Sequence, residues 1–402
     1  MTAPPSALPV LRLKPRADAR RIRHGHPWAW ADELVLDRRS RAIPQGALAL
    51  LEDTGREPLG VGVATVAARI GLRLLDRDPA AVIDRAWFDA RITAALSLRQ
   101  AVCDAPFYRL IHAEGDGLPG LIVDRFGDTL VMQPNAVWLE TREAEIADAL
   151  LAATGCTTLV KNGTGRARAA EGLPEETRVI AGAAPAGPIP VPMTGATCMA
   201  DVTGGQKTGL FYDQRDNHAF AARLARGARV LDVFSHVGGF ALACLAAGAA
   251  RALAVDSSEQ ALALARAGAE ASGSADRLDC RAGDAFATLA ALADEGALFD
   301  LVICDPPAFA PSRQALDRGL RAYERVARLA APLVAPGGTL ILCSCSHAAE
   351  LGKFRAACLR GIGRAGRDPR LIHTGFAGPD HPQHPALTET GYLKALAFRL
   401  LP

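Results

Sequence analysis

The strongest constraint on the fold is a strand–helix alternation that begins near Arg229. Short apolar runs typical of buried parallel strands alternate with segments of helical periodicity. The strand-like runs lie at residues 229–234, 252–256, 277–282, 299–305 and 339–344, and the helical segments lie at 240–248, 258–271 and 314–333. Repeated units of this kind predict an α/β fold, with a parallel sheet covered by helices on both faces.

An acidic residue lies at or just beyond the end of each of the first four predicted strands: Asp232, Asp256, Asp284 and Asp305. Ligands of open parallel sheets bind beyond the carboxyl ends of the strands, near the switch in strand order, so these residues are expected to share a site. Asp256 is placed to accept hydrogen bonds from ribose hydroxyls. Asp284 is expected near an adenine amino group.

The glycine pair Gly238-Gly239 follows the first strand, where a helix begins. A nicotinamide-binding dehydrogenase would need GxGxxG there to hold a pyrophosphate. S-adenosylmethionine (AdoMet) has no phosphate, so a pair suffices. Asp-Pro-Pro at 305–307 forms a stiff, extended turn that can face a planar base. We therefore expect AdoMet as the cofactor. Its further contacts are expected from Phe234, Ser235, Ser257, Ala285 and Pro306.

A chain of 402 residues exceeds one hydrophobic core, and three domains are predicted: 1–77, 78–190 and 191–402. The first consists of short strands separated by Gly, Pro and Asp clusters, typical of a small β-barrel. The second combines an amphipathic helix near its start with strand-like runs, and is predicted to be α+β. The Gly/Ala/Pro-rich run 181–192 leads into the third.

Composition excludes several classes of protein. Half of the residues are apolar and 22% are charged, typical of a soluble globular chain, and no run of 18 apolar residues predicts a membrane span. Prolines interrupt the N-terminal segment where a signal peptide needs an apolar core. Nine scattered cysteines without a CxxC pair predict reduced thiols in the cytoplasm. His381 and His384 are each followed by proline, and we expect surface histidines there and no metal site.

Basic and aromatic residues are interleaved near the N-terminus. Basic side chains can contact phosphates and indoles can stack on bases, whereas a solvated basic surface over core tryptophans is an equally good interpretation of this stretch alone. The expected RNA contacts are Arg12, Lys14, Arg16, Arg20, Arg21, Arg23 and Trp28.

Seven stretches spread over the chain resemble the bacterial 23S rRNA (cytosine-C5) methyltransferases that carry an N-terminal PUA domain. They are RRIRHGHPWAW, EGDGLPGLIVDRFGDTLVMQ, KTGLFYDQRDN, LDVFSHVGGFALACLAAGA, FDLVICDPPAFAPS, CSCSH and DHPQHPALTETGYLKAL. The resemblance implies a PUA barrel, a central α+β domain, a Rossmann-like methyltransferase domain and an rRNA substrate. It also implies that Phe211, Asp213 and Arg215 lie over the cofactor, with Arg215 facing the AdoMet carboxylate. The alternative is an inter-domain turn with a surface arginine.

The chain departs from the family pattern at a few positions. His236 and Val237 stand where the family usually has Tyr and Thr, and His218 stands where Arg is commoner. The helix after Asp256 lacks the usual asparagine. None of these changes removes a group that the chemistry requires. They bear on which substrate the protein uses.

Carbon 5 of cytosine is a weak nucleophile, so its methylation requires covalent activation by a thiolate. Cys345 matches the family's catalytic position, whereas Cys343, on the same side of the predicted strand, is expected to pack in the core. Asp305 is expected to bind the base and stabilise the developing charge, and Phe309 to stack on the base. The open alternatives are a buried structural thiol, a turn-capping aspartate and a core phenylalanine.

Three functions remain open. The first is formation of 5-methylcytosine in a single-stranded or loosened rRNA segment, since a paired base would have to be flipped out. The second is methylation of a base amine, guanine N2 or adenine N6, which needs no cysteine. The third is an RNA-binding protein whose methyltransferase domain is inactive. A cytoplasmic location without a membrane partner is expected, and a homodimer is left open.

Overall fold

The computed structural model describes residues 8–204 and 209–402. Pro4 and Pro5 of the N-terminal segment and the start of the KTGLFYDQRDN stretch lie outside these residues. The chain divides into one unit of Met1–Ala184 with Asp380–Leu387, and a second of Pro185–Pro379 with Thr388–Pro402. Within the described residues, no helix combines the length and apolar character needed to cross a membrane.

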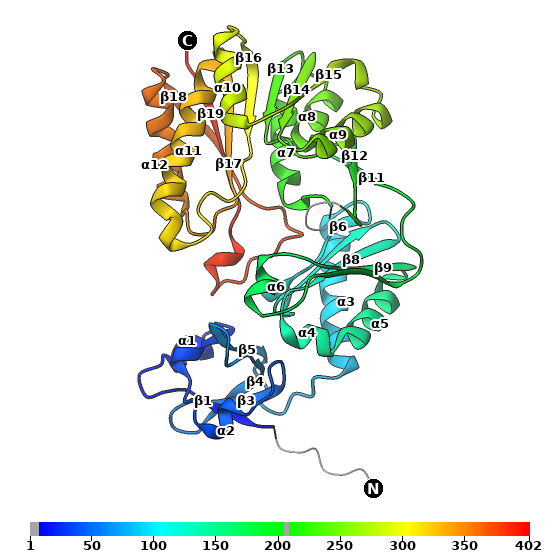
Figure 1. Cartoon of the computed structure of the whole chain (residues 1–402), viewed down its shortest axis with the longest axis vertical. Helices are drawn as coiled ribbons and strands as arrows, with labels where there is room; N and C mark the ends of the chain where they lie inside the picture. Colours follow the sequence, from blue (N-terminus) through cyan, green and yellow to red (C-terminus); the bar gives the residue numbers. More distant parts are fainter. Residues whose placement is uncertain (1–7, 205–208) are drawn as a thin grey trace. The chain divides into compact units, whose positions relative to one another are not determined.

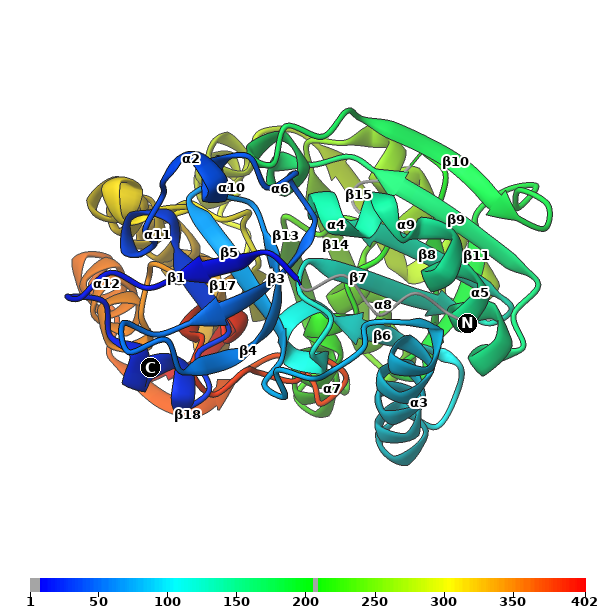
Figure 2. The same cartoon turned by 90° about the horizontal axis from the view of Figure 1, so that it is seen from below.

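The first sheet of the N-terminal unit has five strands in the order β1-β3-β4-β5-β2. Its strands are β1 (Val10–Arg12), β2 (Trp28–Trp30), β3 (Leu48–Glu52), β4 (Pro58–Ala64) and β5 (Ile70–Asp76), with short helices α1 (Ala19–Arg23) and α2 (Arg38–Arg41) in the connections. Ala49 and Leu51 of β3 are buried while their neighbours are half-buried, as expected when one face of a sheet covers a core. Figure 2 shows β3, β4 and β5 lying next to one another.

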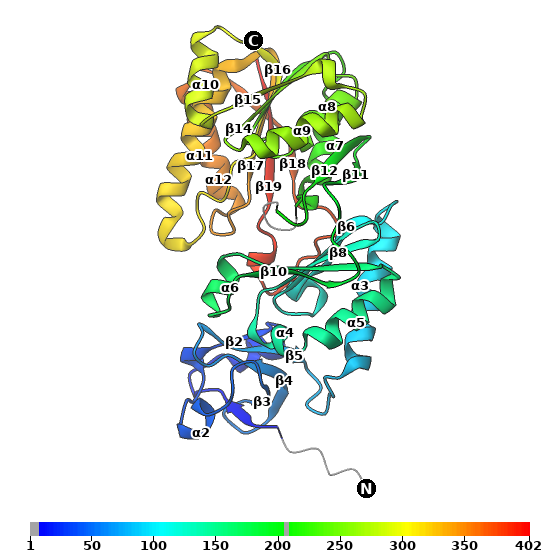
Figure 3. The ribbon, with the colours of Figure 1, turned by 45° about the vertical axis from the view of Figure 1, so that its right-hand side comes forward.

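The second sheet of this unit has the order β10-β9-β8-β7-β6. Its strands are β6 (Phe107–His112), β7 (Leu121–Phe126), β8 (Thr129–Pro134), β9 (Thr158–Gly163) and β10 (Glu176–Ala181), and its helices are α3 (Arg85–Val102), α4 (Val137–Thr141), α5 (Glu143–Thr154) and α6 (Arg166–Ala170). Helices α3 and α5 lie side by side (Figure 3) and share one apolar core with the sheet. Strands and helices occur together here, as the sequence predicts.

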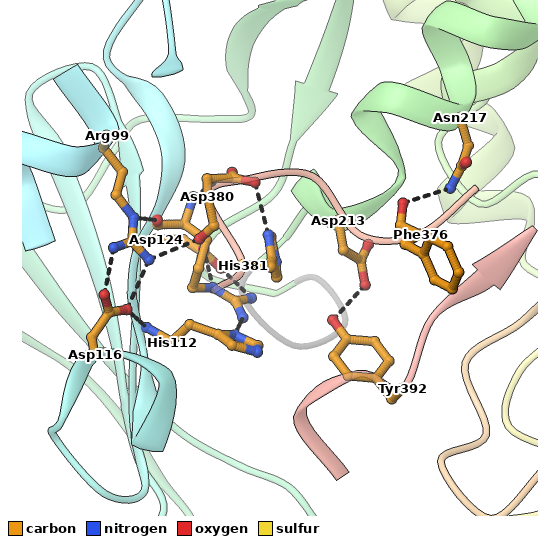
Figure 4. A network of polar contacts seen from close by, with 11 residues as sticks. Arg99, His112, Asp116, Asp124, Asp213, Asn217, Phe376, Asp380, His381 and Tyr392 are labelled. Carbon is orange, nitrogen blue, oxygen red and sulfur yellow. Dashed lines mark hydrogen bonds and ion pairs between the residues drawn. The ribbon is translucent and has the colours of Figure 1, made fainter. Parts of the chain in front are cut away.

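A buried ion-pair network fixes residues Asp380–Leu387 within the N-terminal unit. The fully buried Arg99 guanidinium donates to the Asp116 carboxylate at 2.8 Å and to the Asp380 carbonyl at 2.8 Å (Figure 4). The Asp380 carboxylate accepts from the backbone N–H of Arg109 at 3.1 Å. A buried guanidinium is stable only when its donors are satisfied, so this segment completes the network.

The expectation of surface histidines in this segment is wrong for His381. Its side chain is buried, and its Nδ1 lies 2.9 Å from a carboxylate oxygen of Asp380. His384 is half-buried. The ion pair with Asp380 and the packing of residues Asp380–Leu387 against the N-terminal unit account for the burial of His381. The prolines that follow the two histidines in the sequence give no sign of either.

The second unit holds a seven-stranded sheet in the order β15-β14-β13-β16-β17-β19-β18. Its strands are β13 (Arg229–Val233), β14 (Arg251–Asp256), β15 (Leu278–Ala282), β16 (Phe299–Cys304), β17 (Val334–Ser344), β18 (Pro369–Gly375) and β19 (Lys394–Leu400). The first five strands in chain order are parallel, and β19 runs antiparallel to both its neighbours. A hairpin of β11 (Ile189–Met193) and β12 (Ala196–Ala200) precedes the sheet.

Six helices cover the two faces of this sheet (Figure 1). One apolar core lies under α7 (Arg215–Arg223), α8 (Gly239–Ala246) and α9 (Glu259–Ala271), and another under α10 (Ala285–Asp294), α11 (Leu316–Ala330) and α12 (Leu351–Arg364). The predicted α/β fold is therefore confirmed. Because β13 pairs with β14 on one side and β16 on the other, the strand order switches at β13, where ligands of such sheets bind.

Candidate active site

The loop after β13 has a backbone that side chains rarely adopt. Phe234 and His236 have φ values of +64° and +50°, and Gly238 has a φ of +78°. Positive φ in non-glycine residues costs about 1–3 kcal/mol each and persists where surrounding structure imposes it, often at a functional site. A Cβ on Gly239 would lie 2.6 Å from Cε1 of His218, so only glycine permits this approach.

The carboxylate of Asp256 faces this loop from the end of β14. One oxygen accepts from the backbone N–H of His236 and the other from that of Ser258, both at 2.9 Å. These bonds fix the carboxylate beside the glycine pair, and its contact with ribose hydroxyls stays a prediction. Ser257, beside it, is exposed.

Asp284, the acid after β15, is placed differently. Its side chain caps α10 by accepting from the backbone N–H of Ala287 at 2.9 Å, and it is exposed. The adjacent Ala285 is buried. The helix cap accounts for Asp284 locally, and its contact with an adenine stays a prediction.

Asp232 is fully buried at the end of β13, and burial raises the pKa of its carboxyl to about 7. One oxygen accepts from the backbone N–H of Ala241 at 3.0 Å, and the described residues offer the other oxygen no hydrogen-bond partner. This carboxyl therefore changes its charge near neutral pH.

The Asp232→Asn variant tests this titration in the protein without AdoMet. The folded-state pKa lies above the ordinary value, so the native state binds the extra proton and stability falls as pH rises from about 4 to about 7. At pH 8 the variant should exceed wild type in free energy of unfolding by a few kcal/mol, and at pH 4 the two should agree. Urea unfolding at both pH values measures the difference. An equal difference at both would contradict the raised pKa.

Several buried polar atoms of residues 213–218, of the end of β13 and of the loop after it have no hydrogen-bond partner among the described residues. An unsatisfied buried polar atom costs about 1–3 kcal/mol, so several together indicate a polar ligand. The atoms are Asp213 Oδ1, Gln214 Nε2, Asn217 Oδ1, His218 Nδ1, Asp232 Oδ1 and Ser235 Oγ. Burial lowers the pKa of His218 to about 3, so its ring is neutral. This mixed set of donors and acceptors suits the amino, carboxylate and hydroxyl groups of AdoMet.

The segment from Phe211 to Arg215 lies against this loop. The ring of Phe211 is 4.9 Å from that of His236, and Asp213 is buried and accepts from the Tyr392 hydroxyl at 2.7 Å (Figure 4). Arg215 is half-buried, and its guanidinium carbon lies 5.2 Å from the Tyr212 ring. The structure thus brings these residues to the predicted cofactor side, and their contact with AdoMet stays a prediction.

The thiol of Cys345 lies beside the Asp-Pro-Pro turn. The backbone N–H of Asp305 donates to the Val233 carbonyl at 3.1 Å, which joins the turn to the end of β13. The Cys345 Sγ lies 3.9 Å from the carbonyl oxygen of the buried Pro306. Cys345 is half-buried and therefore reachable.

Cys343 differs from Cys345 in its surroundings. Its side chain is only 1% exposed in an apolar core, and burial raises the pKa of its thiol well above the ordinary range. β17 ends at Ser344, as the predicted strand does, so Cys345 lies one residue beyond it and the expected shared strand face does not extend to Cys345. Cys345 therefore lies outside the sheet.

Phe309 lies in a cluster of aromatic rings. Its ring centroid is 5.0 Å from Tyr323, 6.1 Å from Phe286 and 6.3 Å from Phe234, and its side chain is partly exposed. Edge-to-face and tilted contacts at these distances stabilise the cluster. One part of the ring is packed and another is open, so stacking on a base stays a prediction.

The predicted RNA contacts of the N-terminal unit divide into two groups. Lys14 donates to the Asp32 carbonyl at 2.8 Å, and Trp28 donates to Glu114 at 2.9 Å. Three arginines pair with acids: Arg12 with Glu52, Arg21 with Glu33 and Arg23 with Asp53. Arg16 and Arg20 are exposed and form no ion pair with the described residues. These two are the better candidates for phosphate contacts.

Sequence reasoning missed several residues of this site. Tyr392 binds Asp213, Tyr323 binds both Ser344 and Ser346, and Lys394 donates to the Ser346 carbonyl. For Lys394 a signal existed, because a lysine at the start of an otherwise apolar run is rarely buried without a partner.

The strand order, the glycine pair and the carboxylate after the second strand define an AdoMet-dependent methyltransferase domain. A family model described as S-adenosylmethionine-dependent methyltransferase matches residues 187–399, and one described as a PUA-like domain matches 11–77. The chain therefore belongs to the family of AdoMet-dependent methyltransferases with an N-terminal PUA-like domain. The resemblance drawn from the sequence is confirmed, and the methyl donor is AdoMet.

Relatives and solved structures agree over the whole length. The chain is 33% identical to "Ribosomal RNA large subunit methyltransferase I" of Shewanella amazonensis, over 97% of this chain and 99% of that protein. It is 33% identical to "Ribosomal RNA large subunit methyltransferase" of Deinococcus radiodurans, over 100% of both. A structure described as a methyltransferase complexed with SAH superposes with a TM-score of 0.83 at 17% identity, over 98% of this chain and 100% of that chain. The structural match establishes the fold.

Proposed function

We propose that this protein transfers a methyl group from AdoMet to carbon 5 of a cytosine in 23S rRNA, through a covalent bond to Cys345. The observation that carries the proposal is the reachable thiol of Cys345, 3.9 Å from the carbonyl of the Asp-Pro-Pro turn. The relatives named for methylation of large-subunit rRNA support the substrate class. Ribosomal RNA also makes the cytoplasm the expected place of action.

The residues of the site would act in sequence. The Cys345 thiolate adds to carbon 6 of the base, while the Asp305 carboxyl binds the base edge and stabilises the charge that develops. Carbon 5 gains nucleophilic character and takes the electrophilic methyl group that bound AdoMet supplies. A base then takes the carbon-5 proton, which restores the double bond and releases the cysteine as thiolate.

The fixed elements determine how the site can hold its partners. The Asp256 carboxylate and the backbone of the glycine loop would hold the ribose, and the Arg215 guanidinium the carboxylate of AdoMet. A base inside a duplex cannot reach a half-buried thiol, so the substrate is a single-stranded or loosened rRNA segment. Arg16 and Arg20 would contribute phosphate contacts.

A second function is methylation of a base amine. The Asp-Pro-Pro turn followed by Phe309 favours it, because an acceptor and a neighbouring aromatic ring suit a planar base with an exocyclic amine. This route leaves Cys345 without a role. Dependence of methyl transfer on Cys345 therefore separates the two functions.

Nucleoside mass spectrometry tests the proposal directly. Unmodified 23S rRNA treated with the purified protein and AdoMet should gain 5-methylcytosine, and rRNA from cells lacking the gene should have lost it. Gain of N2-methylguanine or N6-methyladenine, with 5-methylcytosine unchanged, would replace the proposal by the amine function. No methylation together with no AdoMet binding in calorimetry would indicate an RNA-binding protein with an inactive domain.

A further inference from the structure

Lys394 is a buried lysine at the start of an apolar strand. It pairs with Ser344 in the register between β19 and β17, so it lies next to the residue that precedes Cys345. Lys394 is 4% exposed, and the next four residues on β19, from Ala395 to Phe398, are apolar and buried. Burying an ammonium group costs free energy, so a buried lysine at position 394 requires a specific explanation.

The ammonium group has few partners. Its Nζ donates to the carbonyl of Ser346 at 2.8 Å, and no carboxylate of the described residues forms an ion pair with it. Burial lowers the pKa of Lys394 to about 8, while the Cys345 thiol and, to a lesser extent, Glu350 raise it. Glu350 is exposed at the start of α12, where solvent screens its charge. The anionic partner that remains is the sulfur of Cys345.

The polar groups of the residues on either side of Cys345 are hydrogen-bonded without adding charge. The Tyr323 hydroxyl lies 2.8 Å from the Ser344 Oγ and 2.8 Å from the Ser346 Oγ, and burial raises the pKa of Tyr323 to about 12. Tyr323 is thus neutral near pH 7. The Ser346 Oγ also accepts from the backbone N–H of Ala310 at 3.0 Å. The Asp305 carboxyl precedes Pro306, whose carbonyl lies 3.9 Å from the Cys345 sulfur, so a negative charge on Asp305 would oppose a thiolate there.

We propose that Lys394 is a positioning residue that holds the end of β17 through Ser346 and favours the thiolate of Cys345. Before substrate binds, the Cys345 proton passes to solvent, and Lys394 stays protonated and faces the sulfur. After release of the product, the same ammonium group stabilises the departing thiolate. This role rests on the proposed function for its use in catalysis, whereas the ionisation of the thiol can be measured without RNA.

Alkylation of Cys345 by iodoacetamide across pH 5–10, followed by peptide mass spectrometry, tests the proposal. In the wild-type protein the midpoint should lie below the ordinary thiol value of about 8.5. Lys394→Met should raise the midpoint by roughly one pH unit and slow alkylation at pH 7 about tenfold, and Lys394→Arg should keep most of the wild-type behaviour. The half-buried Cys280 of the same unit serves as internal reference.

Each outcome decides the proposal. A wild-type midpoint at or above that of an ordinary thiol overturns it without any variant, so misfolding of Lys394→Met cannot leave it open. An unchanged midpoint in a Lys394→Met protein that still binds AdoMet also overturns it, and the proposed function then stands alone. If Cys345→Ala keeps full methyl transfer while Lys394→Met shifts the midpoint, the proposed function fails and the coupling of Lys394 to Cys345 stands.

Discussion

Replacement of Cys345 by alanine is expected to reduce formation of 5-methylcytosine at least about a thousandfold, since loss of a covalent nucleophile removes the reaction path itself. The affinity for AdoMet should stay within about twofold of wild type, because the thiol lies at the Asp-Pro-Pro turn and not among the expected ribose and carboxylate contacts. Methyl transfer to 23S rRNA and calorimetry with AdoMet measure the two quantities.

Cys280→Ala is the matched control, since Cys280 is a half-buried free thiol on β15 of the same unit. It should keep wild-type activity. A Cys345→Ala protein that methylates rRNA at the wild-type rate would rule out the covalent route and favour transfer to a base amine.

Replacement of Asp256 by alanine is expected to raise the dissociation constant for AdoMet roughly 10- to 100-fold, as one hydrogen bond to a charged group contributes about 1.5–3 kcal/mol. The substitution removes two sets of hydrogen bonds. The backbone N–H groups of His236 and Ser258 lose their acceptor, and the ribose hydroxyls lose the carboxylate that would bind them. Calorimetric titration gives the constant.

Asp276→Asn is the control for this experiment, because Asp276 is an exposed acid of the same unit outside the predicted site. Its affinity for AdoMet should match wild type. Equal affinities of the Asp256 and Asp276 variants would remove the acid after β14 from the cofactor site.

The fold of the C-terminal half could be predicted from local sequence patterns. Parallel strands buried on both faces leave continuous apolar runs, and the helices between them have their own period, so each element is encoded in its own residues. The position of Asp256 followed from the same logic. Once a strand ends and a parallel neighbour exists, the residue after the strand has to lie at the ligand edge.

What could not be predicted depends on pairs of residues far apart in the sequence. Burial of Lys394 next to Cys345 requires β19 to run antiparallel beside β17, and no local pattern determines that register. The side chain of Cys343 is separated from that of Cys345 because β17 ends at Ser344, and strand ends are the least predictable feature of an element. His381 is buried by an aspartate and a distant arginine network.

The docked segment Asp380–Leu387 also has a consequence for biosynthesis. The polar core around Arg99 lies in an N-terminal unit whose other residues end at Ala184, yet it is completed by residues translated about 200 positions later. Until the ribosome has translated residues 380–387, one N–H group of the buried Arg99 guanidinium therefore lacks the Asp380 carbonyl that accepts from it, although Asp116 already balances its charge. A truncated translation product would keep this defect permanently, which gives cellular quality control a means to distinguish it from the finished enzyme.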